Sequence, residues 1–159
     1  MFRAMRRQEK QLSLAGINNL LQHAEYGVLA TVSENGYPYT TPLNYVYSKQ
    51  KIYFHSALEG EKVDNIIRNS QVSFCVVADV ELLPEKFDTN YSSVVLFGMA
   101  EEVFTAEKEA ALIAIIEKYS GEHIEAGKKY VQNSGQTTRV FGITIERLTG
   151  KCQQATVSG

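Results

Sequence analysis

The sequence predicts an α+β domain in which six mostly antiparallel strands form a small barrel or a curled sheet, with helices between the strands. Three observations lead to this fold class. Six short segments are rich in β-branched and aromatic residues or alternate between apolar and polar residues, as half-buried strands do. Two of these segments are separated by Asn35-Gly36, a dipeptide typical of tight hairpin turns. Other segments repeat apolar residues at helical spacing.

The chain starts with a predicted helix and a predicted hairpin. Residues 12–21 carry apolar side chains at helical spacing, and Ser13 is placed to cap that helix. A strand is expected over residues 26–32. The Asn35-Gly36 pair that follows supplies the two positive-φ positions of a type I′ turn.

The next predicted strand contains two prolines. Residues 37–47 favour an extended conformation, but Pro38 and Pro42 cannot donate to a β-ladder. This strand must therefore lie at an edge, or be bulged or broken. A second turn at residues 48–50 leads into a strand over 51–55, so the first three strands are expected to form a meander.

The middle of the chain adds one helix and two strands. Apolar residues at helical spacing predict a short helix between residues 61 and 69. Strand-forming residues return at 72–78 and again at 92–104. A charged loop is expected between them, from residue 81 to residue 90.

The last part of the chain is expected to form helices and the sixth strand. Thr105 is predicted to cap an amphipathic helix, whose inner face carries Leu112, Ile115, Ile116 and Tyr119. Residues 122–132 extend the helical pattern, and residues 139–148 alternate as a strand does.

Composition indicates one globular domain over residues 1–159, with a basic N-terminal arm (1–11) and a C-terminal tail (151–159). The net charge of −2 argues against a nucleic-acid partner, and no apolar run approaches the roughly 18 residues of a membrane span. The arm has no apolar signal region, so the cytoplasm is expected, with a mitochondrial transit peptide as the weaker alternative. Cys75 and Cys152 do not form a disulfide framework, and the histidines lack metal-ligand spacing, so no metal is expected.

The junction at residues 54–65 is the first candidate for chemistry. A strand ends there and a helix begins, and the free N–H groups of a helical first turn suit a phosphate. Ser56 and Lys62 could contact the same anion. In the alternative interpretation, Glu59 and Glu61 complement the helix dipole and Lys62 is a solvated charge.

The strand over residues 37–45 is the second candidate. Its prolines free backbone groups from regular pairing, and Thr and Asn side chains stand beside them, so a flat hydrogen-bonding cofactor ring could pair with it. An edge strand covered by a partner chain is the alternative. With nine tyrosines, no tryptophan and few general bases, any chemistry is expected to belong to a bound cofactor.

An ordered set of segments resembles the pyridoxamine-phosphate-oxidase-like split barrels, and specifically their Nim-type (nitroimidazole-resistance) FMN-binding branch. The matching residues are 25–32, 35–39, 42–47, 51–55, 62–66, 83–87, 91–94, 97–98 and 145–151. The resemblance implies a six-stranded split β-barrel with peripheral helices, and a homodimer that holds two FMN molecules at its interface. Authentic pyridoxamine-phosphate oxidases carry a tryptophan-containing C-terminal signature, which this chain lacks, so vitamin B6 oxidation is not expected.

The resemblance also implies roles for particular residues. Ser56 and Lys62 would hold the FMN phosphate, with Asn65 nearby. His55 would lie at the active site beside the flavin. The ring would be lined by Thr41, Pro42, Leu43 and Asn44, and the partner subunit would contribute Tyr91, Ser92 and Ser93.

The predicted function is that of an FMN-dependent oxidoreductase that reduces a nitroaromatic or another small acceptor. FAD is the alternative flavin. Two other functions stay open: a non-catalytic flavin-binding sensor or storage module, and a split-barrel protein that uses deazaflavin or haem.

Overall fold

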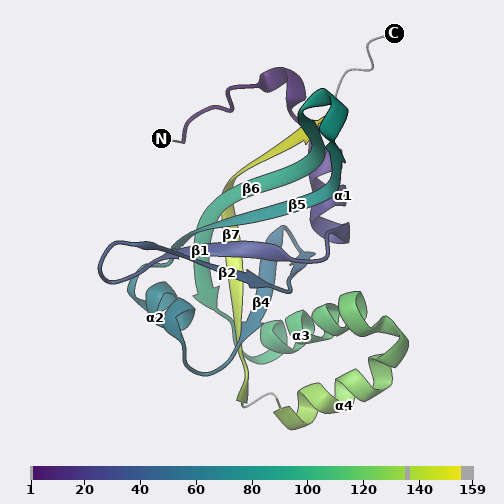
Figure 1. Ribbon diagram of the computed structural model, residues 1–159. Helices are drawn as coiled ribbons and strands as arrows, with labels where there is room; N and C mark the ends of the chain where they lie inside the picture. The colour runs from purple at the N-terminus through teal and green to yellow at the C-terminus, as the bar shows by residue number, and fades with distance from the viewer. Residues whose placement is uncertain (1, 135–136, 155–159) are drawn as a thin grey trace.

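The computed structural model describes residues 2–134 and 137–154, and over these ranges the chain forms one seven-stranded antiparallel sheet flanked by helices (Figure 1). The sheet order is β2-β1-β5-β6-β7-β4-β3. The strands are β1 (Gly27–Val32), β2 (Pro38–Leu43), β3 (Val46–Ser48), β4 (Lys51–Ser56), β5 (Gln71–Leu83), β6 (Asp88–Glu102) and β7 (Arg139–Gln153). The antiparallel α+β class is thus confirmed. The prediction of six strands closing into a barrel is wrong, because the sheet is open and ends in β2 and β3.

Four α-helices accompany the sheet in the described ranges: α1 (Leu14–His23), α2 (Glu61–Arg68), α3 (Thr105–Ser120) and α4 (Ile124–Ser134). Ser13 caps α1 as expected, since its Oγ accepts a hydrogen bond from Gly16 N at 3.1 Å. The cap predicted for α3 is wrong: Phe104 precedes the helix, and Thr105 is its first residue, with no side-chain cap bond. None of the helices in the described ranges is long and apolar enough to cross a membrane.

The seventh strand arises because the segment 37–47 is broken. Tyr45 lies in the break with none of its surface exposed. Its backbone N–H donates to the Tyr119 hydroxyl at 3.1 Å, and that hydroxyl lies 3.0 Å from the Tyr45 carbonyl oxygen. The backbone groups that a ladder would use are therefore bound to a side chain. The expected meander is replaced by two hairpins, β1–β2 and β3–β4, at opposite edges of the sheet.

The two hairpin turns differ in type, and the sequence predicts a type only for the first. At the first, only Gly36 has a positive φ (85°), and Ser33 N donates to Tyr37 O at 2.8 Å. This is a three-residue turn with glycine in the left-handed position, so the hairpin is confirmed but the type I′ geometry is wrong. The second turn has positive φ at both Lys49 (49°) and Gln50 (62°), which is the type I′ pattern.

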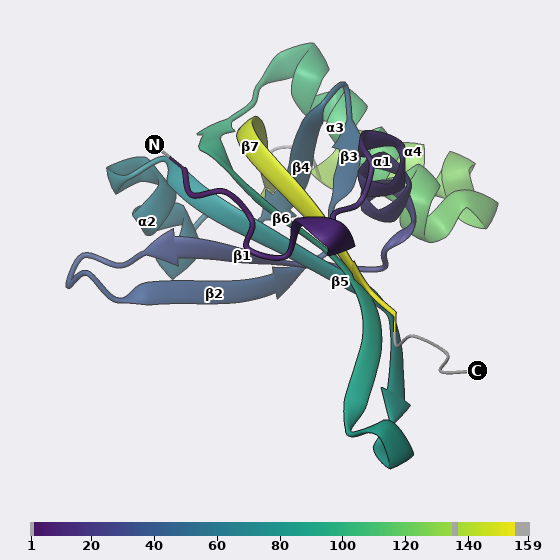
Figure 2. The ribbon, with the colours of Figure 1, turned by 90° about the horizontal axis from the view of Figure 1, so that it is seen from above.

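The β5–β6 hairpin is longer than expected and projects from the body of the domain (Figure 2). The predicted charged loop over residues 81–90 is wrong, since Glu81 pairs with Asn90 and Leu83 with Asp88. A 3₁₀ turn, η2 (Pro84–Lys86), connects the two strands. Charged side chains are tolerated here because this part of the hairpin is exposed on both faces.

Both predicted terminal segments join the fold in part. A short 3₁₀ helix, η1 (Gln8–Lys10), lies within the N-terminal arm. The last strand continues past its predicted end, so Lys151–Gln153 of the expected tail belong to β7. Met1 and residues 155–159 lie outside the described ranges.

The main core lies between the sheet and α1. Its fully buried side chains include Leu21, Leu29, Phe54, Phe74 and Phe141. A smaller cluster, formed by Tyr53, Val103, Ala111 and Val140, lies beneath α3. The two clusters occupy opposite faces of β4, because neighbouring side chains of a strand point to opposite sides.

The β3–β4 turn provides a test of this backbone geometry. Replacing Lys49 by Asn together with Gln50 by Gly is expected to stabilise the protein by about 1 kcal/mol, because those residues adopt positive φ at lower cost. The melting temperature should rise by about 2–4 °C in thermal unfolding. A Lys49→Ala/Gln50→Ala control should show no such gain. An Asn-Gly variant that melts at or below the wild-type temperature would contradict the assigned turn.

Candidate functional site

The junction between β4 and α2 presents the uncapped first turn of a helix. Gly60, with a φ of 141° that favours glycine, forms the N-cap, and no side chain caps the helix. Its carbonyl oxygen accepts hydrogen bonds from Val63 N and Asp64 N at 2.8 and 3.1 Å. The N–H groups of Glu61 and Lys62 therefore have no side-chain cap, and a helical first turn in this state suits an anion.

Ser56 lies at the end of β4 and is only 4% exposed. Its Oγ has no hydrogen-bond partner, and the same holds for Thr41 Oγ1 on β2. In the described ranges, the only other buried side-chain nitrogen or oxygen without a hydrogen-bond partner is Lys118 Nζ, which lies over the Tyr45 ring. An unsatisfied buried hydroxyl costs about 1–3 kcal/mol. Two predicted ligand contacts therefore carry groups that a bound phosphate or a flavin ring could satisfy.

Asn65 fixes α2 against the first hairpin. It is 2% exposed, and its Nδ2 donates to Thr31 Oγ1 at 3.0 Å and to Ser33 Oγ at 3.4 Å. Ser33 Oγ in turn donates to Glu61 Oε1 at 2.7 Å. Both amide hydrogens of Asn65 are thus used within the chain. This side chain positions the helix. Its effect on a phosphate bound nearby would therefore be indirect, through the position of α2.

Partial burial of the imidazole lowers the pKa of His55, and the nearby Lys62 ammonium contributes to the same shift. The ring is therefore neutral at pH 7, where it can donate at one nitrogen and accept at the other. Within the described ranges, Lys62 has no carboxylate at ion-pair distance. Its charge is available to an anion.

His55 faces away from Ser56. Phe54 and Ser56 are buried on one side of β4, whereas His55 is exposed on the other. There it lines a cavity of about 130 Å³ together with side chains of α3 and α4. The other lining residues are Leu112, Ile115, Ile116, Tyr130, Val131 and Thr138. This pocket is mostly apolar, and its ionisable side chains are those of His55 and Tyr130.

The predicted ring-binding residues lie on and beside the edge strand β2. Thr41 and Leu43 are half-buried, while Pro42 and Asn44 are exposed. Because β2 pairs only with β1, one of its sides carries no neighbouring strand. The expectation of an edge strand is confirmed.

The remaining predicted contacts lie far from this junction. Ser92 pairs with Cys152 at one end of β7, whereas Ser56 pairs with Arg139 at the other. A strand of 15 residues spans roughly 45 Å. One chain therefore does not bring Tyr91, Ser92 and Ser93 to the β4–α2 junction.

Arg139 is a cation at the junction that sequence reasoning missed. Its Nη1 donates to Leu58 O at 3.4 Å, and its Nη2 forms an ion pair of 2.5 Å with Glu102. The hydrogen bond that Arg139 donates to the Glu102 carboxylate is the main cause of its raised pKa. No local motif marks Arg139, since only the register between β4 and β7 places it beside Ser56.

The described part of the chain contains no cluster of three or more His, Cys, Asp or Glu side chains that could hold a metal ion. Cys75 and Cys152 are free thiols.

Comparison with known families identifies the class of protein that this fold and junction define. Residues 15–152 match the family model described as pyridoxamine 5'-phosphate oxidase, so the chain belongs to that family. No curated protein is similar enough in sequence to match.

Several solved structures have the same fold. One is provisionally described as a 5-nitroimidazole antibiotic resistance protein of Bacteroides thetaiotaomicron, at 21% identity and a TM-score of 0.74, covering 89% of this chain and 86% of that one. Others are described as flavin-binding proteins. The FAD and haem binding protein of Mycobacterium smegmatis has 16% identity and a TM-score of 0.81 over 92% and 74% of the two chains. An FAD-binding protein of Mesorhizobium loti has 25% identity and a TM-score of 0.63 over 91% and 98%.

The coupling between Lys62 and His55 is open to direct test. A Lys62→Met variant should raise the pKa of His55, because it removes a positive charge that disfavours the imidazolium. The titration is followed by NMR of the imidazole protons, and a His55→Gln variant identifies the signal among those of His23 and His123. An unchanged His55 pKa in the Lys62→Met variant would show that the two side chains are not neighbours.

Proposed function

We propose that this protein is a flavin-dependent oxidoreductase, acting in the cytoplasm, that binds FMN at the interface of a homodimer and reduces a small acceptor such as a nitroaromatic. The observation that carries the proposal is the pair of buried, unpartnered hydroxyls on Ser56 and Thr41. Family resemblance assigns one of these residues to the flavin phosphate and the other to the ring. A bound flavin would supply each with the hydrogen-bond partner that the chain itself does not.

The phosphate would be held at the β4–α2 junction. Ser56 Oγ, the uncapped N–H groups of the α2 first turn and the Lys62 ammonium offer the hydrogen-bond donors and the positive charge that a phosphate dianion requires. The hydrogen bonds from Asn65 fix α2, and therefore Lys62, against β1. The junction is in this sense preorganised, and ligand binding would not have to order the helix.

The flavin ring would lie against β2. Thr41 Oγ1 and the backbone groups on the free side of β2 can form hydrogen bonds with the polar edge of a planar ring. Pro42, Leu43 and Asn44 would complete that surface. Pro42 has no N–H that could donate to a further strand, so its position at the open edge favours contact with a ligand over pairing with another strand.

A second copy of the chain would complete the site. Tyr91, Ser92 and Ser93 on β6 pair with one end of β7, and Ser56 on β4 pairs with the other end. They are therefore too far from Ser56 to contact a flavin held by their own chain. A homodimer would place them at the partner's junction. This requirement supports the dimer, because the two predicted halves of the site can meet only between copies.

When bound, FMN would supply the electron transfer, and the chain would supply binding and hydrogen-bond donors. His55 is neutral at pH 7 and opens onto an apolar pocket, so it can form a hydrogen bond with an uncharged acceptor there. Partial burial and the Lys62 charge both disfavour the imidazolium, so the neutral ring would act there as a hydrogen-bond donor and acceptor rather than as an acid.

The comparisons support this class of function. The Bacteroides relative favours a nitroaromatic acceptor, and the Mesorhizobium and Mycobacterium relatives favour flavin in general. Their descriptions keep FAD as the alternative flavin, and haem as an alternative cofactor.

The decisive variants are Ser56→Ala and Lys62→Met. Each should weaken FMN binding by roughly tenfold to a hundredfold, the worth of a hydrogen bond to a charged group. Ser56→Ala should leave the melting temperature of the flavin-free protein unchanged or raise it, because it removes an unsatisfied buried hydroxyl. If Ser56 had a purely structural role, the Ser56→Ala substitution would instead lower both the FMN affinity and the melting temperature of the flavin-free protein.

Fluorescence titration of FMN and thermal unfolding of the flavin-free protein provide these measurements, with Lys86→Met as the matched charge control. Wild-type FMN affinity in both site variants would refute the proposed anchor. A wild-type protein that binds FMN but oxidises no reductant with any acceptor would leave only the flavin-binding module.

A further inference from the structure

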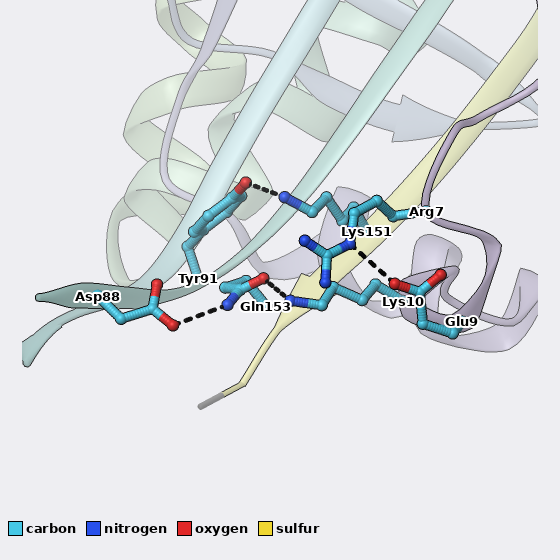
Figure 3. A network of polar contacts seen from close by, with 7 residues as sticks. All are labelled: Arg7, Glu9, Lys10, Asp88, Tyr91, Lys151 and Gln153. Carbon is cyan, nitrogen blue, oxygen red and sulfur yellow. Dashed lines mark hydrogen bonds and ion pairs between the residues drawn. The ribbon is translucent and has the colours of Figure 1, made fainter. Parts of the chain in front are cut away.

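The structure places the basic N-terminal arm against the far end of β7. Leu12 N donates to Gly150 O at 3.0 Å, and Gln11 forms an isolated β-bridge with Lys151. Arg7 and Lys10 lie beside Lys151, near Asp88 and Tyr91 at the start of β6 (Figure 3). The basic N-terminal arm thus contributes to a defined cluster of charges.

These residues surround a shallow hollow of about 490 Å³, which we call the arm basin. Its size falls within the range of small-molecule sites. The residues that line it are Arg7, Lys10, Phe87, Asp88, Thr89, Tyr91, Lys151 and Gln153.

The two lysines of the arm basin donate hydrogen bonds to neutral groups, although both also act on the Asp88 carboxylate through space. Lys10 Nζ donates to Gln153 Oε1, and Lys151 Nζ donates to the Tyr91 hydroxyl (Figure 3). The Lys151 ammonium also lies 4.6 Å from the centre of the Tyr91 ring. Among the described residues, no carboxylate lies at ion-pair distance from either lysine. Since an ammonium has three donors, each lysine keeps capacity for an anion.

The nearby carboxylates are already engaged by other groups. Asp88 accepts hydrogen bonds from Thr89 N at 2.8 Å and from Gln153 Nε2 at 3.0 Å. Glu9 pairs with Arg7 at 2.8 Å. Three cations therefore face two carboxylates, and the surplus is positive although the whole chain carries a net charge of −2.

An exposed aromatic ring lies at the rim of the arm basin. Phe87 is 98% exposed, and its backbone is in the left-handed region, with a φ of 49°. A phenylalanine is unfavourable here for two reasons: its ring gains no free energy from burial, and its backbone conformation is strained. A flat ligand stacked on the ring would recover apolar contact.

We propose that the arm basin binds a nucleoside diphosphate, with its phosphates on Lys10 and Lys151 and its base on Phe87. Lysine ammoniums bind phosphate oxygens as point charges, and Arg7 adds a guanidinium at the same rim. Stacking on an aromatic side chain accommodates any base. None of the β4–α2 junction residues lines this hollow, but Tyr91 does, and the proposed function places Tyr91 at the flavin of the partner subunit. A ligand in the arm basin would therefore lie beside that flavin, and in this respect the inference rests on the proposed dimer.

Calorimetric titration of ADP into the full chain saturated with FMN provides the test, because FMN then occupies any flavin site. Lys10→Met and Lys151→Met should each weaken ADP binding at least fivefold, and Phe87→Ala should weaken it severalfold. Raising the salt concentration should weaken binding further. Lys86→Met, on the same hairpin but outside the hollow, is the matched control and should match the wild type.

Two further titrations separate the outcomes. Inorganic phosphate should bind more weakly than ADP, and equal affinity together with an unaffected Phe87→Ala variant would refute the stacking of the base. Absence of ADP binding, or full affinity in both lysine variants, would overturn the proposal. Lys62→Met should keep the wild-type affinity for ADP, and a loss there would assign ADP to the flavin junction and refute the arm basin. Circular dichroism confirms that each variant is folded.

Discussion

The architecture depends on the burial of Tyr45 at the point where the chain passes from one edge of the sheet to the other. Its hydroxyl donates to Leu21 O at 2.7 Å, and its backbone is bound to the Tyr119 hydroxyl, so α1 and α3 both hold it. Burial raises the pKa of the phenol, which keeps the hydroxyl a neutral donor. Because this residue cannot join a ladder, β2 and β3 become the two edges of an open sheet, and β2 keeps a free side.

That open edge and the β4–α2 junction are joined mechanically by α2. The Asn65 side chain binds the helix to Thr31 on β1, which is itself paired with β2. The helix that would present Lys62 to a phosphate is thus fixed to the hairpin that would support the flavin ring. Ser92 and its neighbours on β6 lie beside the opposite end of β7. The strand register that sets Ser56 beside Arg139 therefore separates the two predicted halves of the site within one chain.

Local patterns in the sequence predicted local features correctly. Ser13 caps its helix, the Asn35-Gly36 segment forms a hairpin, and residues 54–65 form a strand-to-helix junction. Two local details, the Thr105 cap and the type I′ geometry at Asn35-Gly36, were wrong, but the errors in topology arise where distant contacts decide. The break at Tyr45 needs the Tyr119 hydroxyl, which lies far along the chain, and the position of Arg139 follows only from strand register. The buried, unpartnered state of the predicted contact hydroxyls could likewise not be inferred from sequence.

The most direct test of a flavin site divided between two copies is subunit complementation. One chain carries Ser56→Ala with Lys62→Met, and the other carries Ser93→Trp, which would obstruct the partner's site. Each variant alone should bind FMN poorly. After mixing and subunit exchange, each mixed dimer should regain one intact site, so the account predicts restored affinity at one FMN for every two chains. Failure to regain binding in a mixed dimer whose formation is verified by mass spectrometry would contradict the account.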